Sequence, residues 1–379
     1  MIKINQEFSL KTKIICGQGS LKELKKLEGR TAMIVSDKII EEIGYVETIK
    51  GYLTQAGLSS HVFTDVRPDP DTKVLADGLK MLQQVKPDVL IAMGGGSAID
   101  AAKGILYSTY QMLGDSFKKP YFAAIPTTSG TGSEVTDFSV ITAEGDKIVL
   151  VNEYMAPNLA ILDSDCVASV PRKVVIDTGM DVLTHATEAY VANDATDFTD
   201  AMVEKTVRLL FENLPLLAED IGNEQARNHV HNASCMAGIA FTHAGLGINH
   251  SLAHAVGGTL HLPHGRCNAL LLEEVIAFNG DLGKSANNYA AKRYAKLAEL
   301  LDLPARTVRE GLVSYIDAVR KLKEQLAIES GFASLGVDEE VYQTAIENMA
   351  EAAMLDRCTP ANPVKPTKEE LIKIYKTVY

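Results

Sequence analysis

The strongest constraint on the fold is a change of pattern near Val170. Before it, short apolar runs alternate with segments of helical periodicity, and after it helical segments follow one another without a further strand. Uninterrupted apolar strands joined by helices are typical of a parallel sheet covered on both faces. A chain of 379 residues is also too long for one ordinary core. We therefore predict an α/β domain over residues 1–178 and an all-helical domain over residues 179–379.

Periodicity also predicts the individual elements. Strands are expected at 12–16, 31–36, 60–65, 88–95, 121–126, 136–142, 147–151 and 159–163, and helices between them at 38–57, 71–86 and 97–112. Later helices are expected at 172–191, 198–219, 223–245, 248–261, 266–279, 285–301, 305–329 and 338–354.

Composition excludes several classes of partner. A net charge of −12 disfavours nucleic acid and anionic membranes. No apolar segment reaches the length of a membrane span, and MIKINQEFSL lacks the apolar core of a signal peptide. The five cysteines are scattered without C-x-x-C spacing, which favours reduced thiols. We therefore expect a cytoplasmic protein.

Histidines gather in the second half, where seven of the nine lie between His229 and His264. Four share one short segment rich in Gly, Ala and Leu: His250, His254, His261 and His264. Upstream, Asp181 and His185 stand four residues apart and would share a helix face. Such a pair is often a plain surface contact, but a carboxylate with several imidazoles in apolar surroundings suits zinc or ferrous iron. The sequence predicts a metal site, and the spacing leaves open which two or three of the four later histidines are ligands.

Two loops that follow predicted strands suit a nucleotide. In MGGGSAID (93–100), Gly94, Gly95 and Gly96 allow close backbone approach, Ser97 can cap the next helix, and the helix start favours phosphate. In IPTTSGTGSEVT (125–136), hydroxyls could hold phosphate or ribose. The first loop is not the G-x-G-x-x-G fingerprint, so its alternative is an ordinary tight strand-to-helix turn. The alternative for the second loop is a plain Ser/Thr loop without a ligand.

Asp37 ends the predicted strand TAMIVS, where an acidic residue commonly receives the ribose hydroxyls of an adenine nucleotide. A helix N-cap role for Ser36 or Asp37 is equally natural on local grounds.

Together, GGGSAID, PTTSGTGSEVT, GMDVLTHATEAY and NHSLAHAVGG with LPHG resemble, in this order, motifs of the iron-containing (group III) alcohol dehydrogenases. The ending TPANPVKPTKEELIKIY also resembles that family. FSLKTKIICGQGSL, DFTDA and HNASCMAGIAF resemble its propanol dehydrogenases of propanediol-utilisation microcompartments. The resemblance implies a dehydroquinate synthase-like fold, in which an α/β nucleotide-binding domain with a parallel sheet precedes an all-α metal-binding domain.

The resemblance also implies the site residues. The implied ligands of Fe²⁺, or alternatively Zn²⁺, are Asp181, His185, His250 and His264. The implied contacts to NAD are Asp37, Gly95, Gly96, Ser97, Asp100, Thr127, Thr128, Thr131 and Lys147, beside the loop glycine Gly94. His254 matches a histidine beside the metal that is not a ligand, His261 matches none, and Asp69 stands where relatives commonly have Asn.

The implied activity is NAD(H)-dependent interconversion of short-chain primary alcohols and aldehydes, of the propanol and propionaldehyde type, working as an aldehyde reductase. His254, one helical turn from His250, is the candidate proton relay, and a structural role in orienting a ligand is its alternative. Expected partners are a small uncharged substrate, further copies in a homodimer or larger homo-oligomer, and enzymes of a bacterial microcompartment. Three alternatives to this activity remain enzymes: a zinc polyol (glycerol-type) dehydrogenase, another short diol or butanol dehydrogenase, and a metal-dependent cyclase of the dehydroquinate synthase type. A fourth alternative is a non-catalytic nucleotide-and-metal sensor.

Overall fold

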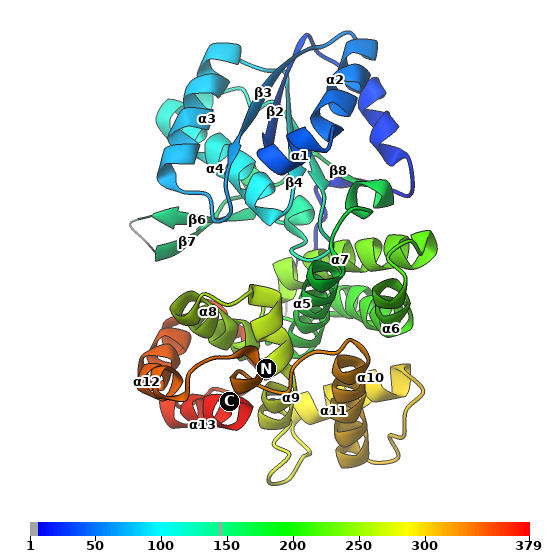
Figure 1. The fold of residues 1–379 in the computed structure, drawn as a ribbon, viewed down its shortest axis with the longest axis vertical. Coiled ribbons are helices and arrows are strands. Elements are labelled where there is room, and N and C mark those ends of the chain that lie inside the picture. The colour runs from blue at the N-terminus through cyan, green and yellow to red at the C-terminus, as the bar shows by residue number, and fades with distance from the viewer. Residues whose placement is uncertain (1–6, 144–145) are drawn as a thin grey trace. The chain divides into compact units, whose positions relative to one another are not determined.

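The computed structural model describes residues 7–143 and 146–379. The chain forms two compact units (Figure 1), one of Ser9–Val170 and the other of Pro171–Tyr379 together with Glu7 and Phe8. The boundary predicted after residue 178 falls inside helix α5 (Arg172–Val191), so this helix belongs as a whole to the second unit. The signal-peptide prediction rests on a segment whose first six residues lie outside the described ones.

The first unit is built on a parallel sheet. Its strands are β1 (Lys13–Cys16), β2 (Thr31–Asp37), β3 (Ser59–Val66), β4 (Val89–Gly94), β5 (Tyr121–Pro126) and β8 (Leu159–Leu162). They lie in the order β1-β8-β5-β4-β2-β3, with every neighbouring pair parallel. The predicted parallel sheet is confirmed. Strands β6 (Phe138–Ala143) and β7 (Asp146–Val151) pair separately as an antiparallel hairpin.

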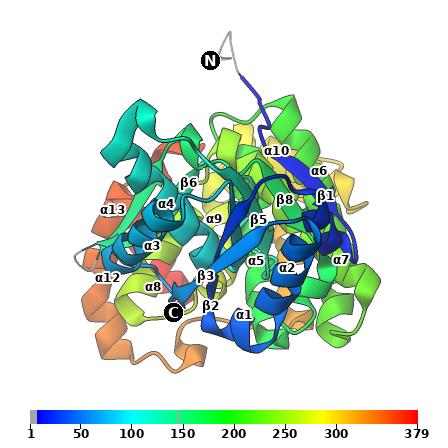
Figure 2. The same ribbon diagram turned by 90° about the horizontal axis from the view of Figure 1, so that it is seen from above.

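Helices cover both faces of this sheet (Figures 1 and 2). They are α1 (Lys38–Glu42), α2 (Tyr45–Gln55), α3 (Thr72–Val85) and α4 (Gly96–Leu113). Met33 and Val35 of β2 pack with residues of α3 and α4, while Ala32 and Ile34 pack with residues of α2. This alternation follows from the two-residue repeat of a strand. The helix predicted at 38–57 is divided because Gly44 adopts a left-handed conformation with φ 89°.

The carboxyl ends of the central strands bring the two predicted nucleotide loops to one edge. Because β2, β4 and β5 are parallel, Asp37, Gly94 and Pro126 end neighbouring strands on the same side. The Ser36 hydroxyl donates to the Met93 carbonyl at 2.7 Å, which ties two of these strand ends together.

Among its described residues the second unit contains helices joined by loops and no strand. Its helices are α5, α6 (Asp197–Glu219), α7 (Glu224–Ala244), α8 (Ile248–Leu260), α9 (His264–Asn279), α10 (Tyr289–Leu300), α11 (Val308–Gln325), α12 (Glu339–Leu355) and α13 (Lys368–Val378). The predicted all-helical domain is confirmed. Helix α13 was missing from the prediction, although Thr367 and Glu370 form a capping box at its start.

Helix α5 runs through the interior of this unit. Its residues from Gly179 to Val191 are buried, and it packs against α6, α7 and α9. A side chain at Gly265 would collide with the carbonyl oxygen of Asp177. Glycine at this position therefore allows the start of α9 to approach α5 closely, which brings His264 towards Asp181. Among the described residues, no helix combines the length and the apolar character that crossing a membrane requires.

Candidate metal centre

Three of the four predicted ligands converge in the second unit. Asp181 on α5, His250 on α8 and His264 on α9 offer ligand atoms that lie within 4.8 Å of one another. Oδ1 of Asp181 is 3.6 Å from Nε2 of His250 and 3.4 Å from Nε2 of His264. We call these three residues the ligand group. Residue spacing left the choice among the later histidines open and the resemblance implied these two, which the packing of α8 and α9 against α5 brings beside Asp181.

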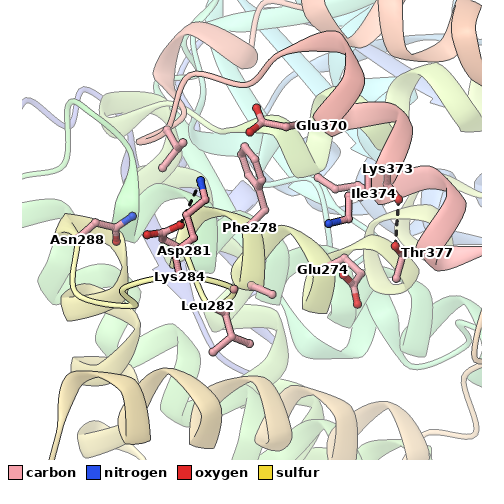
Figure 3. A pocket seen from close by; sticks show the side chains of 13 residues that line it. Glu274, Phe278, Asp281, Leu282, Lys284, Asn288, Glu370, Lys373, Ile374 and Thr377 are labelled. Atoms are coloured by element: carbon pink, nitrogen blue, oxygen red, sulfur yellow. Dashed lines mark hydrogen bonds and ion pairs between the residues drawn. The ribbon is translucent and has the colours of Figure 1, made fainter.

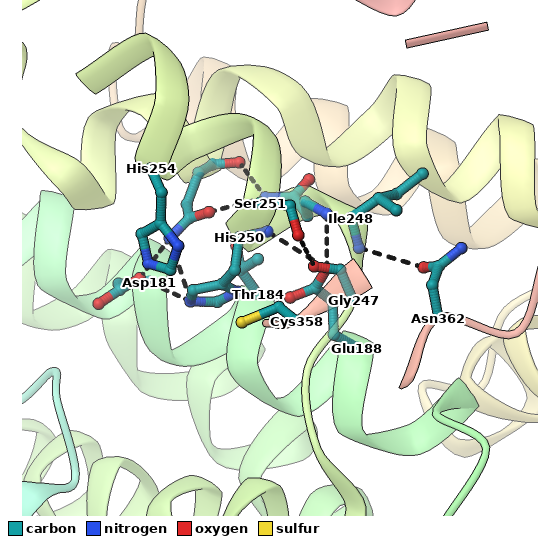
Figure 4. A network of polar contacts seen from close by, with 12 residues as sticks. Asp181, Thr184, Glu188, Gly247, Ile248, His250, Ser251, His254, Cys358 and Asn362 are labelled. Atoms are coloured by element: carbon teal, nitrogen blue, oxygen red, sulfur yellow. Dashed lines mark hydrogen bonds and ion pairs between the residues drawn. The ribbon is translucent and has the colours of Figure 1, made fainter. Parts of the chain in front are cut away.

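Glu188 fixes the orientation of His250 (Figure 4). Nδ1 of His250 is hydrogen-bonded to Oε2 of Glu188, and both side chains are 2% exposed. Oε1 of Glu188 accepts from the backbone N–H of Asn249 at 2.7 Å, at the start of α8. With Nδ1 carrying the proton toward the carboxylate, Nε2 presents its lone pair to the ligand group. Glu188 was not predicted, although it lies seven residues after Asp181 and therefore on the same face of α5.

His185 lies beside the ligand group. Its ring stacks on those of His250 and Phe241, each with a centroid separation of 4.5 Å. Its buried Nδ1 has no hydrogen-bond partner in the part of the chain that the structure describes. A buried imidazole nitrogen without a partner is costly unless a ligand or an ion completes it.

The ligand group fits a divalent transition metal. Two atoms about 2.1 Å from a tetrahedral ion are roughly 3.4 Å apart, which agrees with both measured separations. Carboxylate and imidazole donors suit zinc and ferrous iron alike. Asp181, His250, His264 and the orphaned imidazole of His185 therefore provide the donor types that such a metal needs.

Charge in this buried region supports a cation. Burial alone would raise the pKa of the Asp181 carboxyl, but His185, His264 and His250 together lower it. Burial lowers the pKa of His185 to about 3, which leaves this imidazole neutral and able to donate a lone pair. Although burial opposes it, the charges of Glu188 and Asp181 raise the pKa of His250 to about 9. The two buried carboxylates thus favour a positive charge at His250, and a metal ion would supply one there.

The remaining two histidines take different places. His261 ends α8 in a left-handed conformation with φ 55° and is exposed. His254 stacks on His264 with a centroid separation of 5.2 Å, and its Nδ1 is 2.9 Å from Oδ2 of Asp356. Asp356 was also not predicted, because it lies 102 residues further along the chain and has no spacing that links it to His254.

In the first unit, the predicted loop residues form a nucleotide cradle, which we define as residues 94–97 and 127–131. The backbone N–H of Thr127 donates to the Gly94 carbonyl at 2.9 Å. A Cβ on Gly96 would lie 2.8 Å from Cγ2 of Thr131, so glycine is needed there. A Cβ on Gly95 would meet only Thr128, at an ordinary 3.5 Å. The chain itself therefore does not require glycine at 95, and the space beside it suits a ligand.

The start of α4 is open to an anion. Gly95 is its N-cap, and no side chain caps it among the described residues. The prediction that Ser97 caps this helix is wrong, because Ser97 already lies inside its first turn. Uncapped N–H groups and the helix dipole favour a phosphate at this point.

Asp37 combines the two roles that the sequence left open. Its Oδ1 accepts from the backbone N–H of Ile40 at 3.0 Å and so caps α1. Its Oδ2 lies 3.3 Å from the position that a Cβ on Gly94 would occupy, at the edge of the nucleotide cradle. One carboxylate oxygen is therefore a structural cap, and the other lies over the cradle.

Two predicted cofactor contacts are engaged elsewhere. Buried Asp100 accepts from the Ser133 hydroxyl at 2.6 Å and from the backbone N–H of Val140 at 3.1 Å. Buried Lys103 donates to the same hydroxyl at 3.0 Å, so both side chains hold the end of the second loop. Lys147 lies on β7 and pairs with Asp69 at 2.8 Å. The contacts of Asp100 and Lys147 with NAD stay predictions, beside these contacts within the chain.

A separate surface pocket of about 560 Å³ lies in the second unit (Figure 3). Phe278, Leu282 and Ile374 provide its apolar wall, and Lys284 and Lys373 lie at its margin. None of the predicted site residues lines it.

The comparisons with known proteins agree with this architecture. Residues 11–164 match the family described as iron-containing alcohol dehydrogenase, and residues 175–379 match the C-terminal part of the Fe-containing alcohol dehydrogenase family. The chain is 41% identical to the 1-propanol dehydrogenase PduQ of Citrobacter freundii, over 94% of this chain and 95% of that protein. It is 38% identical to the NADPH-dependent butanol dehydrogenase of Clostridium saccharobutylicum, over 98% and 97% of the two chains.

Among solved structures, an iron-containing alcohol dehydrogenase from Thermococcus thioreducens is similar at a TM-score of 0.90 and 35% identity, over 98% of this chain and 99% of that one. These matches extend over both compact units. The chain therefore belongs to the iron-containing alcohol dehydrogenase family.

Proposed function

We propose that the protein interconverts a short-chain primary alcohol and its aldehyde, of the propanol and propionaldehyde type, with NAD(H) as the hydride carrier and aldehyde reduction as the working direction. The observation that carries this proposal is the convergence of buried Asp181 and His250 with the more exposed His264 on one point. The names of the propanol and butanol dehydrogenase relatives support the substrate class. We propose ferrous iron as the metal, because the family's description names iron, with zinc as the alternative.

When bound, the metal polarises the substrate oxygen as a Lewis acid and the nicotinamide donates or accepts the hydride. Asp181, His250, His264 and His185 would hold the metal. Glu188 keeps His250 in the tautomer that leaves Nε2 free, and the close approach at Gly265 sets the position of His264. These residues fix geometry before the substrate arrives, which lowers the reorganisation that the reaction requires.

His254 is the proposed proton relay. Because Asp356 accepts from Nδ1, the other ring nitrogen, Nε2, is left as an acceptor. The His254 side chain is 40% exposed, so it can exchange a proton with solvent, whereas buried His250 cannot. Asp356 is itself held by the Ser251 hydroxyl at 3.2 Å and by the Cys358 backbone N–H at 2.8 Å.

The nucleotide cradle is the proposed binding site for the dinucleotide. The open start of α4 at Gly95 would receive the pyrophosphate, with the hydroxyls of Thr128 and Thr131 beside it. Asp37 would receive the adenosine ribose through the oxygen that is not used for capping α1.

The direct test is a screen for NADH oxidation over aldehydes of two to five carbons and over dihydroxyacetone, with iron-loaded and zinc-loaded enzyme side by side. We expect the highest kcat/KM with propionaldehyde or butyraldehyde, and higher activity in the iron-loaded enzyme. Faster turnover of dihydroxyacetone by the zinc-loaded enzyme would favour a polyol dehydrogenase. Bound metal and NADH without turnover of any substrate would favour a sensor.

Asp37 is expected to make the enzyme prefer NAD(H) over NADP(H). Two like charges 4 Å apart repel by about 4 kcal/mol at an effective dielectric of 20, and solvent at this half-buried position reduces the effect to ~2 kcal/mol. This corresponds to roughly a thirtyfold preference. Asp37→Ser should remove the charge but keep the cap on Ile40, and should therefore improve use of NADPH without destabilising α1.

Steady-state kinetics with both cofactors, in wild type and in Asp37→Ser, measures this preference. The butanol dehydrogenase relative is named as NADPH-dependent, so the cofactor preference that we expect for this chain differs from that of a relative. Equal use of NADH and NADPH by the wild type would mean that Asp37 serves only as a helix cap.

We further propose a cytoplasmic homodimer or larger homo-oligomer that can associate with microcompartment enzymes. No disulfide joins any of the five cysteines, all of which lie among the described residues, and this suits a reducing compartment. The edge strands β1 and β3 leave backbone groups available for pairing with a second copy. The similarity to a propanol dehydrogenase, PduQ, motivates the microcompartment. Light scattering of the purified protein tests the oligomer, and co-purification with compartment shells tests the association.

A further inference from the structure

A buried amide lies against all three members of the ligand group. Nδ2 of Asn268 is 2.7 Å from Oδ1 of Asp181, 3.1 Å from Nε2 of His264 and 3.3 Å from Nε2 of His250. Asn268 is fully buried on α9, four residues after His264, so both side chains leave the same face of the helix. An amide nitrogen has two hydrogens, and of the three atoms around it the carboxylate oxygen of Asp181 is the nearest and can only accept.

The neighbouring Asn249 determines which end of the Asn268 amide faces the ligand group. Nδ2 of Asn249 is 3.2 Å from the backbone carbonyl of Asn268, which can only accept. The same nitrogen must then donate to Oδ1 of Asn268, 2.9 Å away. Oδ1 of Asn268 is thus held on the Asn249 side, and the N–H₂ group is directed at Asp181.

The bond to Asp181 is compatible with a bound metal, whereas those to the histidines are not. A carboxylate oxygen has two lone pairs and can accept from Asn268 while it donates to an ion. An imidazole Nε2 has one lone pair, which the metal would take. In a metal-bound state His250 and His264 would give up their contacts with the amide, whereas the contact between Asn268 and Asp181 would be retained.

We propose that Asn268 is a positioning residue of the metal centre: its amide holds Oδ1 of Asp181 in place and so sets the affinity of the site for divalent metal. This inference rests on the proposed metal centre and goes beyond it, because Asn268 is not itself a ligand. Asn249 contributes by fixing the amide's orientation, and its backbone N–H bonds to Glu188, which orients His250. A continuous set of buried hydrogen bonds thus connects two ligands on different helices.

The test measures metal affinity directly, without turnover. Purified full-length protein, stripped of metal, is titrated with Zn²⁺ and separately with Co²⁺ against a competing chelator. Asn268→Leu keeps the side-chain volume and removes the donor, and we expect it to weaken the affinity for both ions by about tenfold, the lower end of the usual effect of such supporting residues. Asn268→Asp places a second carboxylate at the same point and should strengthen the affinity.

Asn279→Leu provides a matched control. Asn279 is another fully buried asparagine of α9, and its side chain bonds to Asn362 rather than to the ligand group. This variant should lower the melting temperature in the way that any lost buried amide does, with unchanged metal affinity. The proposal is supported if metal affinity falls in Asn268→Leu, rises in Asn268→Asp and stays at the wild-type value in Asn279→Leu.

Two results would overturn it. If Asn268→Leu binds Zn²⁺ as tightly as the wild type, the inference about Asn268 fails while the metal centre stands. The same holds if both Asn268 variants weaken binding only as much as Asn279→Leu does. If the wild type itself binds neither Zn²⁺ nor Co²⁺, the proposed metal centre fails and the inference with it.

Discussion

His250→Ala and His264→Ala are each expected to remove the bound metal and to reduce activity to background, with NADH binding retained. Both side chains present Nε2 to Oδ1 of Asp181, so each substitution removes one of the few donors at the centre. His250→Ala should in addition lower the melting temperature, because that change leaves Glu188 as a buried carboxylate without its imidazole partner. NADH binding should persist because the nucleotide cradle belongs to the other compact unit.

The measurements are metal content after dialysis, NADH binding by fluorescence, and aldehyde reduction. His261→Asn is the matched control: it removes a histidine from the same segment, and asparagine tolerates the left-handed conformation found there. This control should keep the wild-type metal content. Stoichiometric metal in either alanine variant would show that the replaced histidine is not a ligand.

His254→Ala is expected to keep the metal but to slow turnover by about a hundredfold, the lower range for loss of a proton-transfer group. Its ring stacks on His264 without joining the ligand group, and its polar contact is with Asp356. The reduction should fall on kcat more than on KM, because His254 is proposed to act on the reacting proton and not on substrate binding. Asp356→Asn should give a smaller decrease, since the imidazole remains but loses the carboxylate that orients it.

Metal content and kinetics measured on the same preparations separate the two roles of this histidine. His254→Gln controls for the lost volume, because it fills part of the space without providing a comparable relay. Loss of the metal from His254→Ala would show that His254 either binds the metal or positions a residue that binds it. Unchanged kcat in the metal-loaded variant would exclude it as the relay.

Much of the architecture was determined by local patterns in the sequence. Alternating apolar runs and helical segments predicted the parallel sheet, and α5 was expected at 172–191, the bounds found in the structure. These predictions succeed because the repeats of strand and helix depend on backbone geometry alone. Asp181 and His185 could be paired for the same reason, since four residues on a helix bring two side chains to one face.

Local patterns were insufficient wherever the backbone changed direction or a single position had to be assigned. Gly44 divides the helix expected at 38–57, and Ser97 lies inside the helix that it was expected to cap. Local patterns also gave no sign that the buried carboxylate of Asp100 accepts from Ser133 and Val140. Each of these details depends on which groups lack a partner after packing, and a residue pattern does not contain that information.

The composition of the metal centre was decided by tertiary structure. Residue spacing placed four histidines in one segment without choosing among them, and the packing of α8 and α9 against α5 brings His250 and His264 to Asp181 and turns His261 outward. Glu188, Asn268 and Asp356 come from three different helices or their ends, and they support the site by hydrogen bonds across the interior. The sequence by itself thus determined the residue types that can bind a metal, and the close approach of the helices, which depends on many distant contacts at once, determined which of them meet.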